Sequence, residues 1–414
     1  RALSNSAGQI DVMPLTALAA EYRRIESELL ERWDAPLIND FLCMIAFGLS
    51  RKLIERWAGK PGLELHNDVM IGQGDIISAE PAQRIARMAA LAKADSELML
   101  ALAGGDRSVL ARHKELESEV DSYIAKFGDR CTEELKLESI TLMDDPRPLL
   151  AAIAATARSA RNEPARGDER SDPVRALFAG KRLKGFIARR ALSWAKARVR
   201  DRENLRFERT RVFGYARRLF LAVGRQLHAS GILDEPRDVF LLTVPEVLGA
   251  IEGFATSADL KGLAAIRKAE MVQAHQRPDP PERISFSGAA VCRSYAQQAA
   301  RQSKDAGGDL RHATGCCAGT VRGRARVVRD PKTEVVQPGE ILVARHTDPG
   351  WIALFTNASA IVVERGSLLS HSAIVARELG IPCIVGLKGA MDWLVTGDLI
   401  EVDGAAGSVR RLDG

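Results

Sequence analysis

Residues 366–382 read GSLLSHSAIVARELGIP, and this stretch has the marks of a short helix with a defined beginning and end. Ser370 is a good N-cap residue, because its hydroxyl can accept a hydrogen bond from a free N–H group of the first turn. Gly380 fits the left-handed position that follows a helix, and Pro382 prevents continuation of the helix. The stretch therefore predicts a helix whose first residue is His371.

His371 would lie on the first turn of this helix. The partial positive charge of a helix N-terminus favours an anion and disfavours an extra proton on an imidazole. A neutral imidazole is a nucleophile, and the helix end would hold a phosphoryl group bound to it. The simpler interpretation is that His371 only caps the helix or packs against it. The surrounding residues favour the first interpretation.

Sequence blocks on both sides of His371 follow the order of a known family. They are GEILVA at 339–344, TDPGW at 347–351, AIVVE at 360–364, PCIVG at 382–386, GD at 397–398, VDG at 402–404 and Gly407. Together with the helix stretch, they resemble the swivelling phosphohistidine domain of phosphoenolpyruvate synthase, pyruvate phosphate dikinase and rifampin phosphotransferase. The family usually has a second glycine at Ser367, alanine at Ser372, and Ser-Pro-Gly at 317–319. None of these departures removes the nucleophile.

The resemblance implies specific roles around the histidine. His371 would carry the phosphoryl group as a phosphohistidine intermediate. Ser370, Ser372 and Thr347 would position that group on the swivelling domain.

The hydrophobic pattern divides the chain into three parts. Residues 1–275 predict a mostly α-helical domain, residues 276–311 predict a linker, and residues 312–414 predict a small α/β domain. Strands are expected at 321–328, 340–343, 360–363, 383–385, 399–402 and 408–411, alternating with helices near 350–357, 371–380 and 390–395. The linker would let the histidine visit two distant sites.

Three local expectations concern the helical part. A helix that begins at Leu15 is expected to end before Pro36. Residues 40–48 are apolar on all sides, so they predict a buried helix. Residues 231–246 resemble the close of the family's central domain, which implies a short strand followed by a helix.

A charged segment at 127–138 follows a predicted helix. It is interpreted either as a solvated loop or edge strand, or as part of an acceptor site. The segment resembles a stretch near the acceptor cleft of rifampin-phosphotransferase-like enzymes. That resemblance implies that Arg130 binds a phosphoryl group and that Glu134 or Glu138 accepts a hydroxyl proton.

A dense basic series runs through residues 181–220. A nucleic-acid-binding helix is one interpretation, but the aromatic residues fall on the apolar stripe and no nucleic-acid module is recognisable. A long surface helix with solvated arginines is another. The resemblance to the family's Arg-Glu-x-x-Arg helix implies that Arg202, Arg206 and Arg209 meet the phosphates delivered by the moving histidine.

Composition narrows the remaining classes of function. The chain has 414 residues, enough for about two or three domains, and its net charge of +5 is modest for this length. We therefore expect no nucleic-acid partner. No signal peptide is evident, and no apolar run is long enough to cross a bilayer, so no membrane partner is expected. The first residue is Arg1, which is compatible with a fragment of a longer protein.

The six cysteines are scattered, with neither a CxxC pair nor a Cys/His cluster at metal-binding spacing. We therefore expect no metal site, and a reducing, cytoplasmic location. The cysteines are Cys43, Cys131, Cys292, Cys316, Cys317 and Cys383.

The family layout implies a dikinase-type phosphotransferase, or a fragment or subunit of one. It resembles the rear part of a rifampin phosphotransferase, or the larger subunit of phenylphosphate-synthase-like enzymes. We recognise no Walker A motif, so ATP and Mg²⁺ are expected on another domain or subunit. ATP would yield AMP, Pi and a phosphorylated small hydroxylated molecule. The alternatives are an ATP-dependent ligase that uses the same phosphohistidine, and a non-catalytic phosphocarrier.

Overall fold

The computed structural model describes residues 9–69, 77, 80–158, 173–277, 308–331 and 334–412. Two compact units are present. The first comprises residues 1–5, 23–217 and 310–414, and the second comprises residues 6–22 and 218–309. The expected linker lies almost wholly outside the described residues. The predicted division into domains 1–275 and 312–414 stays a prediction.

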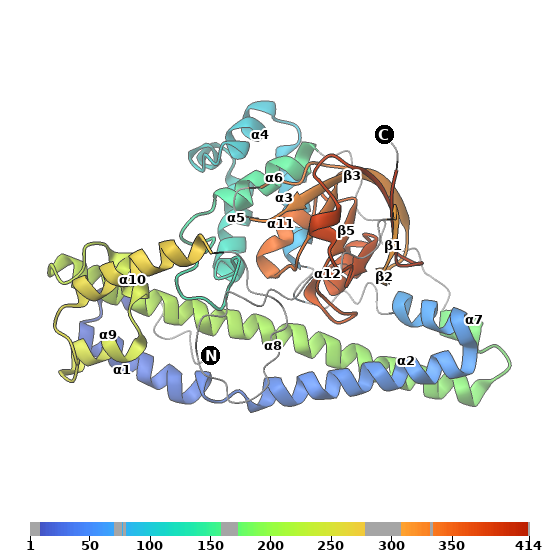
Figure 1. The fold of residues 1–414 in the computed structure, drawn as a ribbon, viewed down its shortest axis with the longest axis horizontal. Coiled ribbons are helices and arrows are strands. Elements are labelled where there is room, and N and C mark those ends of the chain that lie inside the picture. The colour runs from blue at the N-terminus through green and yellow to red at the C-terminus, as the bar shows by residue number, and fades with distance from the viewer. Residues whose placement is uncertain are drawn as a thin grey trace. The chain divides into compact units, whose positions relative to one another are not determined.

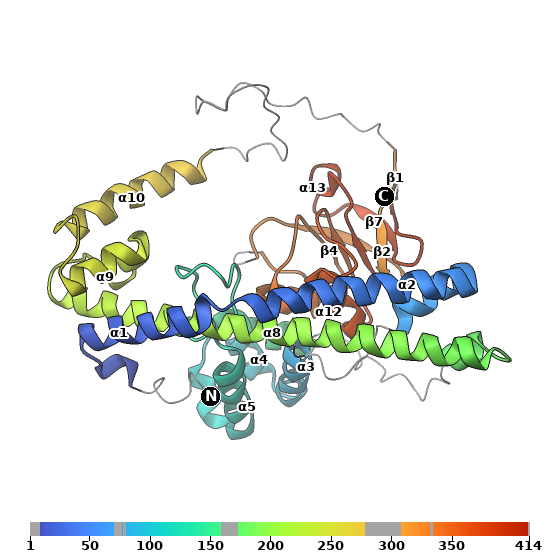
Figure 2. The same cartoon turned by 90° about the horizontal axis from the view of Figure 1, so that it is seen from below.

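Two long helices lie side by side and antiparallel in the first unit, α2 (Asp34–Val69) and the first part of α8 (Arg182–Ala229) (Figures 1 and 2). α2 changes direction at Gly59, where φ is +64°. Their contact is apolar, and it buries Cys43, Ala46 and Phe47 of α2 with Ala188, Leu192, Ala195 and Val199 of α8.

The prediction that residues 40–48 are buried on all sides is wrong. Phe41 is 54% exposed, and Met44 and Ile45 are exposed to a similar degree. A neighbouring helix covers only one stripe of α2, so apolar residues on its other faces stay exposed. The helix that begins at Leu15 ends before Pro36, as expected. Pro36 itself lies in the first turn of α2, where its fixed φ suits a helix start.

Shorter helices form the rest of this helical part. They are α3 (Glu80–Ala92), α4 (Ser96–Ala103), the 3₁₀ turn η3 (Ser108–Arg112), α5 (Lys114–Phe127), α6 (Arg147–Arg158) and α7 (Pro173–Leu177). Asp95 caps α4 by accepting hydrogen bonds from two backbone N–H groups of its first turn. Buried residues such as Met88, Tyr123 and Ile153 join α3, α5 and α6 in one apolar core.

The C-terminal part is an eight-stranded sheet in the order β1-β8-β7-β3-β4-β5-β6-β2. Its strands are β1 (Leu310–His312), β2 (Thr314–Cys317), β3 (Thr320–Val328), β4 (Ile341–Ala344), β5 (Ala360–Val363), β6 (Cys383–Val385), β7 (Leu399–Asp403) and β8 (Ser408–Arg411). The four strands from β3 to β6 are parallel, and the outer pairs are antiparallel. The predicted small α/β fold is confirmed, and each of the six expected strands is present to within one residue.

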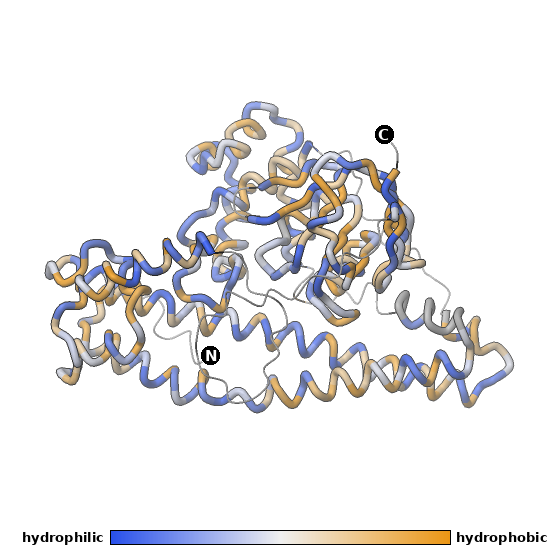
Figure 3. Tube along the Cα trace, in the orientation of Figure 1, coloured by the Kyte–Doolittle hydropathy of each residue, from blue (hydrophilic) through white to orange (hydrophobic). Residues whose placement is uncertain are grey.

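Strands β4 and β5 are buried on both faces, which explains their unbroken apolar sequence (Figure 3). One face, with Leu342 and Val363, packs in a core shared with α11 (Ile352–Phe355) and α12 (His371–Leu379). The other face, with Val343 and Val362, packs against α13 (Ala390–Trp393) and Leu394. The sheet therefore supports α12, and with it His371, from one side.

The second unit contains the end of α8, a 3₁₀ turn η4 (Pro236–Leu241), α9 (Val244–Glu252) and α10 (Leu260–His275). The expected strand within 231–246 is wrong, because η4 occupies that place, whereas the expected helix is present as α9. Glu246 caps α9 and forms a two-pronged ion pair with Arg267 of α10. The same unit includes most of α1 (Leu15–Ile25), whose Tyr22 ring contacts the Phe220 ring edge-on.

In the part of the chain that the structure describes, no helix is both long and apolar enough to span a membrane. The five cysteines that it includes are all buried, and none of them forms a disulfide. Among those residues, no group of three or more His, Cys, Asp or Glu side chains is arranged to hold a metal ion.

Candidate functional site

His371 is the first residue of α12, as predicted, and Gly380 ends that helix with a left-handed φ of +64°. The predicted capping hydrogen bond of Ser370 is absent, so that detail of the prediction is wrong. Its hydroxyl donates instead to the carbonyl of Ser367 at 2.8 Å and lies 3.0 Å from the hydroxyl of Ser372. The two hydroxyls thus form a pair on residues that flank the histidine in sequence.

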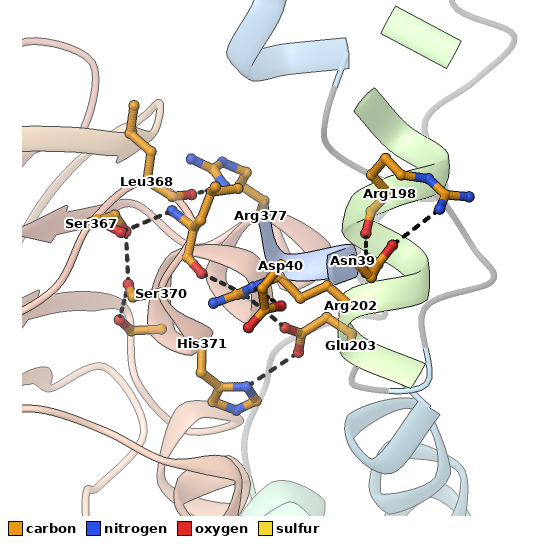
Figure 4. Close-up of polar contacts among 12 residues, drawn as sticks. Asn39, Asp40, Arg198, Arg202, Glu203, Ser367, Leu368, Ser370, His371 and Arg377 are labelled. Carbon is orange, nitrogen blue, oxygen red and sulfur yellow. Dashed lines mark hydrogen bonds and ion pairs between the residues drawn. The ribbon is translucent and has the colours of Figure 1, made fainter. Parts of the chain in front are cut away.

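The imidazole of His371 faces a buried carboxylate on α8. Its Nδ1 atom lies 3.8 Å from Oε2 of Glu203, and both side chains are almost fully buried (Figure 4). The ring of Phe355 stacks at a centroid distance of 6.3 Å. Nε2 is buried and has no hydrogen-bond partner among the described residues. Nδ1 thus lies beside a carboxylate, whereas Nε2 meets no polar partner among the described residues.

Arg202 of α8 joins the helical part of the first unit to its sheet part. Its guanidinium donates to the carbonyl of Leu369 at 2.8 Å and to Glu203 at 3.3 Å, and it pairs with Asp40 of α2 at 3.2 Å. Arg206 lies nearby on α8, where burial and the charge of Arg202 lower the pKa of its guanidinium. The structure therefore brings Arg202 into contact with the histidine loop and places Arg206 within the electrostatic influence of Arg202 and Glu203.

Arg209 lies elsewhere on the helix. Its guanidinium sits over the ring of Trp33 at 5.8 Å, although its buried Nε atom has no partner among the described residues. Glu138 is exposed. The positions of Arg209 and Glu138 therefore support a role beside His371 less than the positions of the other predicted site residues do.

Arg130 and Glu134 lie on the turns that follow α5, and both are buried. Burial raises the pKa of Glu134, while the charges of Arg130 and His371 and a hydrogen bond from Thr210 act in the opposite direction. The guanidinium of Arg130 lies 5.2 Å from the ring centroid of Phe207 on α8. These predicted residues therefore share one electrostatic environment with the histidine.

A buried arginine holds this segment against α8. Arg217 donates to the backbone carbonyls of Leu137, Glu134 and Lys136 at 3.0, 3.1 and 2.9 Å. Gly214 adds a close approach, because a Cβ atom there would lie 2.1 Å from Oδ1 of Asp129. The turn that carries Arg130 and Glu134 is thus positioned by α8.

The loop after β4 meets the same segment from the other side. Oδ2 of Asp348 accepts a hydrogen bond from the backbone N–H of Glu133 at 2.9 Å, and Oδ1 accepts one from Gly350 at 2.9 Å. Burial raises the pKa of Asp348, while the charge of His371 is among the influences that lower it. Thr347, beside it, has a buried hydroxyl without a partner among the described residues.

Several polar atoms in this region are buried and unsatisfied within the described residues. They are Nε of Arg130, Oε2 of Glu134, Oγ1 of Thr347 and Nε2 of His371. Buried polar groups in native proteins normally have partners, so a cluster of such atoms indicates a place for a polar group that the chain itself does not supply. Both donors and acceptors are present, as the binding of a phosphoryl oxygen and a hydroxyl would require.

A cavity of about 890 Å³ opens between α3, α5 and α8, adjacent to this cluster. Its lining is mixed, with Ile77, Glu80, Gln83, Ser122, Ala125, Lys126, Asn204, Phe207, Glu208 and Arg211. Phe207 links the two places, because its ring also contacts Arg130. Asn204 follows the histidine-facing Glu203 directly in sequence.

Two residues near His371, Glu203 and Asp348, are not among the site residues predicted from the sequence. Glu203 was visible in the Arg-Glu-x-x-Arg segment, and Asp348 in the TDPGW block. Neither could be selected from the sequence, since their proximity to His371 depends on contacts between distant segments.

Family models match two parts of the chain. Residues 336–407 match the PEP-utilising enzyme mobile domain, and residues 39–206 match the rifampicin phosphotransferase fourth domain. These matches confirm the resemblance that the sequence blocks indicated.

Individual relatives agree with these matches. A protein of Mycobacterium tuberculosis strain H37Rv that is described as uncharacterized is 35% identical over 342 residues, which is 82% of this chain and 37% of the relative. Rifampicin phosphotransferases of Streptomyces sp and Bacillus subtilis are 29% and 26% identical, each over 70% of this chain and 34% of their own length. The chain thus spans about a third of the length of these relatives.

Proposed function

We propose, from the premise that the chain matches both the mobile domain of PEP-utilising enzymes and the fourth domain of rifampicin phosphotransferases, that it is part of a phosphotransferase. His371 carries a phosphoryl group from ATP to a hydroxyl of a small-molecule acceptor. Another domain or subunit binds ATP and Mg²⁺. The observation that carries the proposal is the orientation of His371, with Nδ1 toward Glu203 and Nε2 unpartnered among the described residues.

This orientation selects the nucleophilic nitrogen. A carboxylate beside Nδ1 favours the tautomer that has its proton there, so the lone pair lies on Nε2. Glu203 acts as a positioning residue, in the way that a carboxylate orients a catalytic imidazole. The phosphoryl group therefore resides on Nε2.

Transfer to the acceptor forms one O–P bond and breaks one N–P bond. The acceptor oxygen attacks phosphorus, and Nε2 of His371 leaves with the bonding electron pair. Glu134 takes the hydroxyl proton, for which its buried, unsatisfied Oε2 and its raised pKa are suited. Burial favours Glu134 over the exposed Glu138 for this role.

Cationic side chains stabilise the phosphoryl oxygens during transfer. Arg130 and Arg206 are largely enclosed by protein, where the interaction of a guanidinium with an anion is stronger than in water. Arg202 holds the loop before His371 through the carbonyl of Leu369. Thr347, Ser370 and Ser372 supply hydroxyl groups on the histidine side.

The histidine must leave this position to receive its phosphoryl group. Nε2 is buried here, so ATP on another domain or subunit has no access to it. We assign the present arrangement to the acceptor half of the cycle. The cavity beside Phe207 is the proposed acceptor site. A phosphocarrier without an acceptor would not need such a cavity.

The test follows label from β- and γ-labelled ATP in wild type, His371→Ala and the control His312→Ala, whose histidine lies exposed on β1. The ATP-binding domain or subunit is supplied. We expect acid-labile label from the β position in wild type and the control only. Absence of label in wild type would contradict the proposal. Product analysis then separates a phosphate ester from the condensed product and free phosphate that a ligase would give.

A further inference from the structure

The loop that follows β4 makes an unusually close backbone contact with the turn that follows α5. A Cβ atom at Gly350 would lie 2.4 Å from the backbone nitrogen of Thr132 and 2.5 Å from the carbonyl carbon of Cys131. Real Cβ contacts are never this short, and backbone atoms cannot move aside as a flexible side chain can. The contact therefore depends on the absence of a side chain at position 350.

A hydrogen bond joins the same two segments. Asp348 accepts from the N–H of Glu133, which has a left-handed φ of +56°. Such a conformation costs about 1 kcal/mol or more in a residue other than glycine and persists only where its surroundings enforce it. Arg217 holds the following residues from the other side through three carbonyls. The turn thus presents its backbone to the loop in a constrained shape.

We propose that residues 348–350 and 131–133 form a docking latch, which holds the mobile domain in the acceptor-facing position. This inference rests on the proposed function. The latch lies beside Glu134 and Thr347, so closing it places the histidine domain against the proposed proton acceptor. A second contact joins Arg202 of α8 to the carbonyl of Leu369, two residues before His371.

Gly350→Ala offers a selective test of the latch. Gly350 has no left-handed φ, so alanine is compatible with the conformation of its own loop. The clashing atoms belong to the helical part and not to the sheet domain. The substitution should therefore oppose docking while leaving the fold of the sheet domain intact. Asp348→Ala removes the hydrogen bond without adding volume and serves as a second variant.

The measurement is hydrogen exchange of the full chain, followed by mass spectrometry. Overpacking at a backbone contact costs about 1–3 kcal/mol, so Gly350→Ala is expected to speed exchange in peptides covering 129–136 about tenfold. Asp348→Ala should speed exchange in the same peptides. Gly308→Ala is the matched control, because a Cβ atom there meets nothing within 4 Å.

Two results would overturn the latch. One is unchanged exchange of residues 129–136 in both variants. The other is faster exchange that extends to β4 and β5 in Gly350→Ala, since the contact would then be needed for the fold of the domain itself. Neither result depends on phosphorylation. If wild type takes no label from ATP, the proposed function fails, while the exchange experiment still decides whether the latch exists.

Discussion

At the scale of single residues, Glu134 combines burial with proximity to charge. Its carboxylate loses hydration, while Arg130 compensates only in part, so the pKa of the side chain is raised. A raised pKa makes a carboxylate a stronger base, which suits removal of a proton from a hydroxyl. It also means that the base is protonated, and hence inactive, at higher pH than an ordinary carboxylate would be.

We predict that Glu134→Gln lowers the rate of phosphoryl transfer about 10²- to 10⁴-fold, the range for loss of a general base. Phosphorylation of His371 by ATP should be retained, because the ATP half of the cycle occurs elsewhere. In wild type, the acidic limb of the pH–rate profile should lie above the ordinary range of a glutamate, about pH 4.3, and the variant should lack that limb.

Single-turnover transfer from the labelled enzyme, measured across pH, gives both quantities. Glu138→Gln is the matched control, since that side chain is exposed. A wild-type limb at the ordinary glutamate range, or one that persists in Glu134→Gln, would assign the base elsewhere.

At the scale of elements, α8 is the support of the helical half of the site. Glu203 and Arg202 project from it toward the histidine loop, while Arg217 and Gly214 position the turn with Glu134. The glycine lies within a helix, where it lowers intrinsic stability by about 1 kcal/mol relative to alanine. The close approach of Asp129 accounts for its presence.

We predict opposite effects of alanine at two helical glycines. Gly214→Ala should destabilise the protein by about 1–3 kcal/mol, because its Cβ atom would overlap the Asp129 carboxylate. Gly48→Ala in α2 should stabilise it by about 0.5–1 kcal/mol, since a Cβ atom there meets nothing within 4 Å. Urea denaturation of both variants checks this. Equal changes in the free energy of unfolding for the two variants would mean that helix propensity alone sets the effect of alanine at these positions.

At the scale of the molecule, the first unit buries two carboxyl groups whose pKa values are raised by burial, Glu134 and Asp348. A raised pKa means that the folded state binds these protons more tightly than the unfolded state does. The contribution of both groups to stability is therefore fully present below their unfolded pKa values. It is lost as pH rises through their folded pKa values.

The double variant Glu134→Gln/Asp348→Asn has neither titrating carboxyl group. We predict that the free energy of unfolding of wild type, minus that of the double variant, increases as pH falls from about 8 toward about 4. Asparagine keeps an acceptor for the N–H of Glu133 but loses the acceptor for the N–H of Gly350. That loss does not depend on pH, so the pH dependence of the difference reports the charge. Denaturant titrations at intervals of pH measure the difference. A difference independent of pH would show that neither carboxyl is protonated more readily in the folded protein.

Local sequence signals were sufficient for much of the fold. Six strands and the helix at His371 follow from apolar runs, glycines and Pro382, because such signals act through neighbouring residues. The end strands β1 and β2 were missed, since each is short and gains its hydrogen bonds from strands far along the chain. The exposed face of α2 was mispredicted for a similar reason: apolar sequence indicates that burial is favourable but not that a partner covers each face.

The sequence by itself determined which residue is the candidate nucleophile and which family motifs surround it. Only the tertiary structure decided which side chains face it. Glu203, Glu134 and Asp348 lie more than twenty residues from His371 in sequence, on α8, the turn after α5 and the loop after β4. Their approach depends on side-chain packing, the Arg217 hydrogen bonds and the missing side chains at Gly214 and Gly350. Contacts of this kind are three-dimensional, so no local pattern records them.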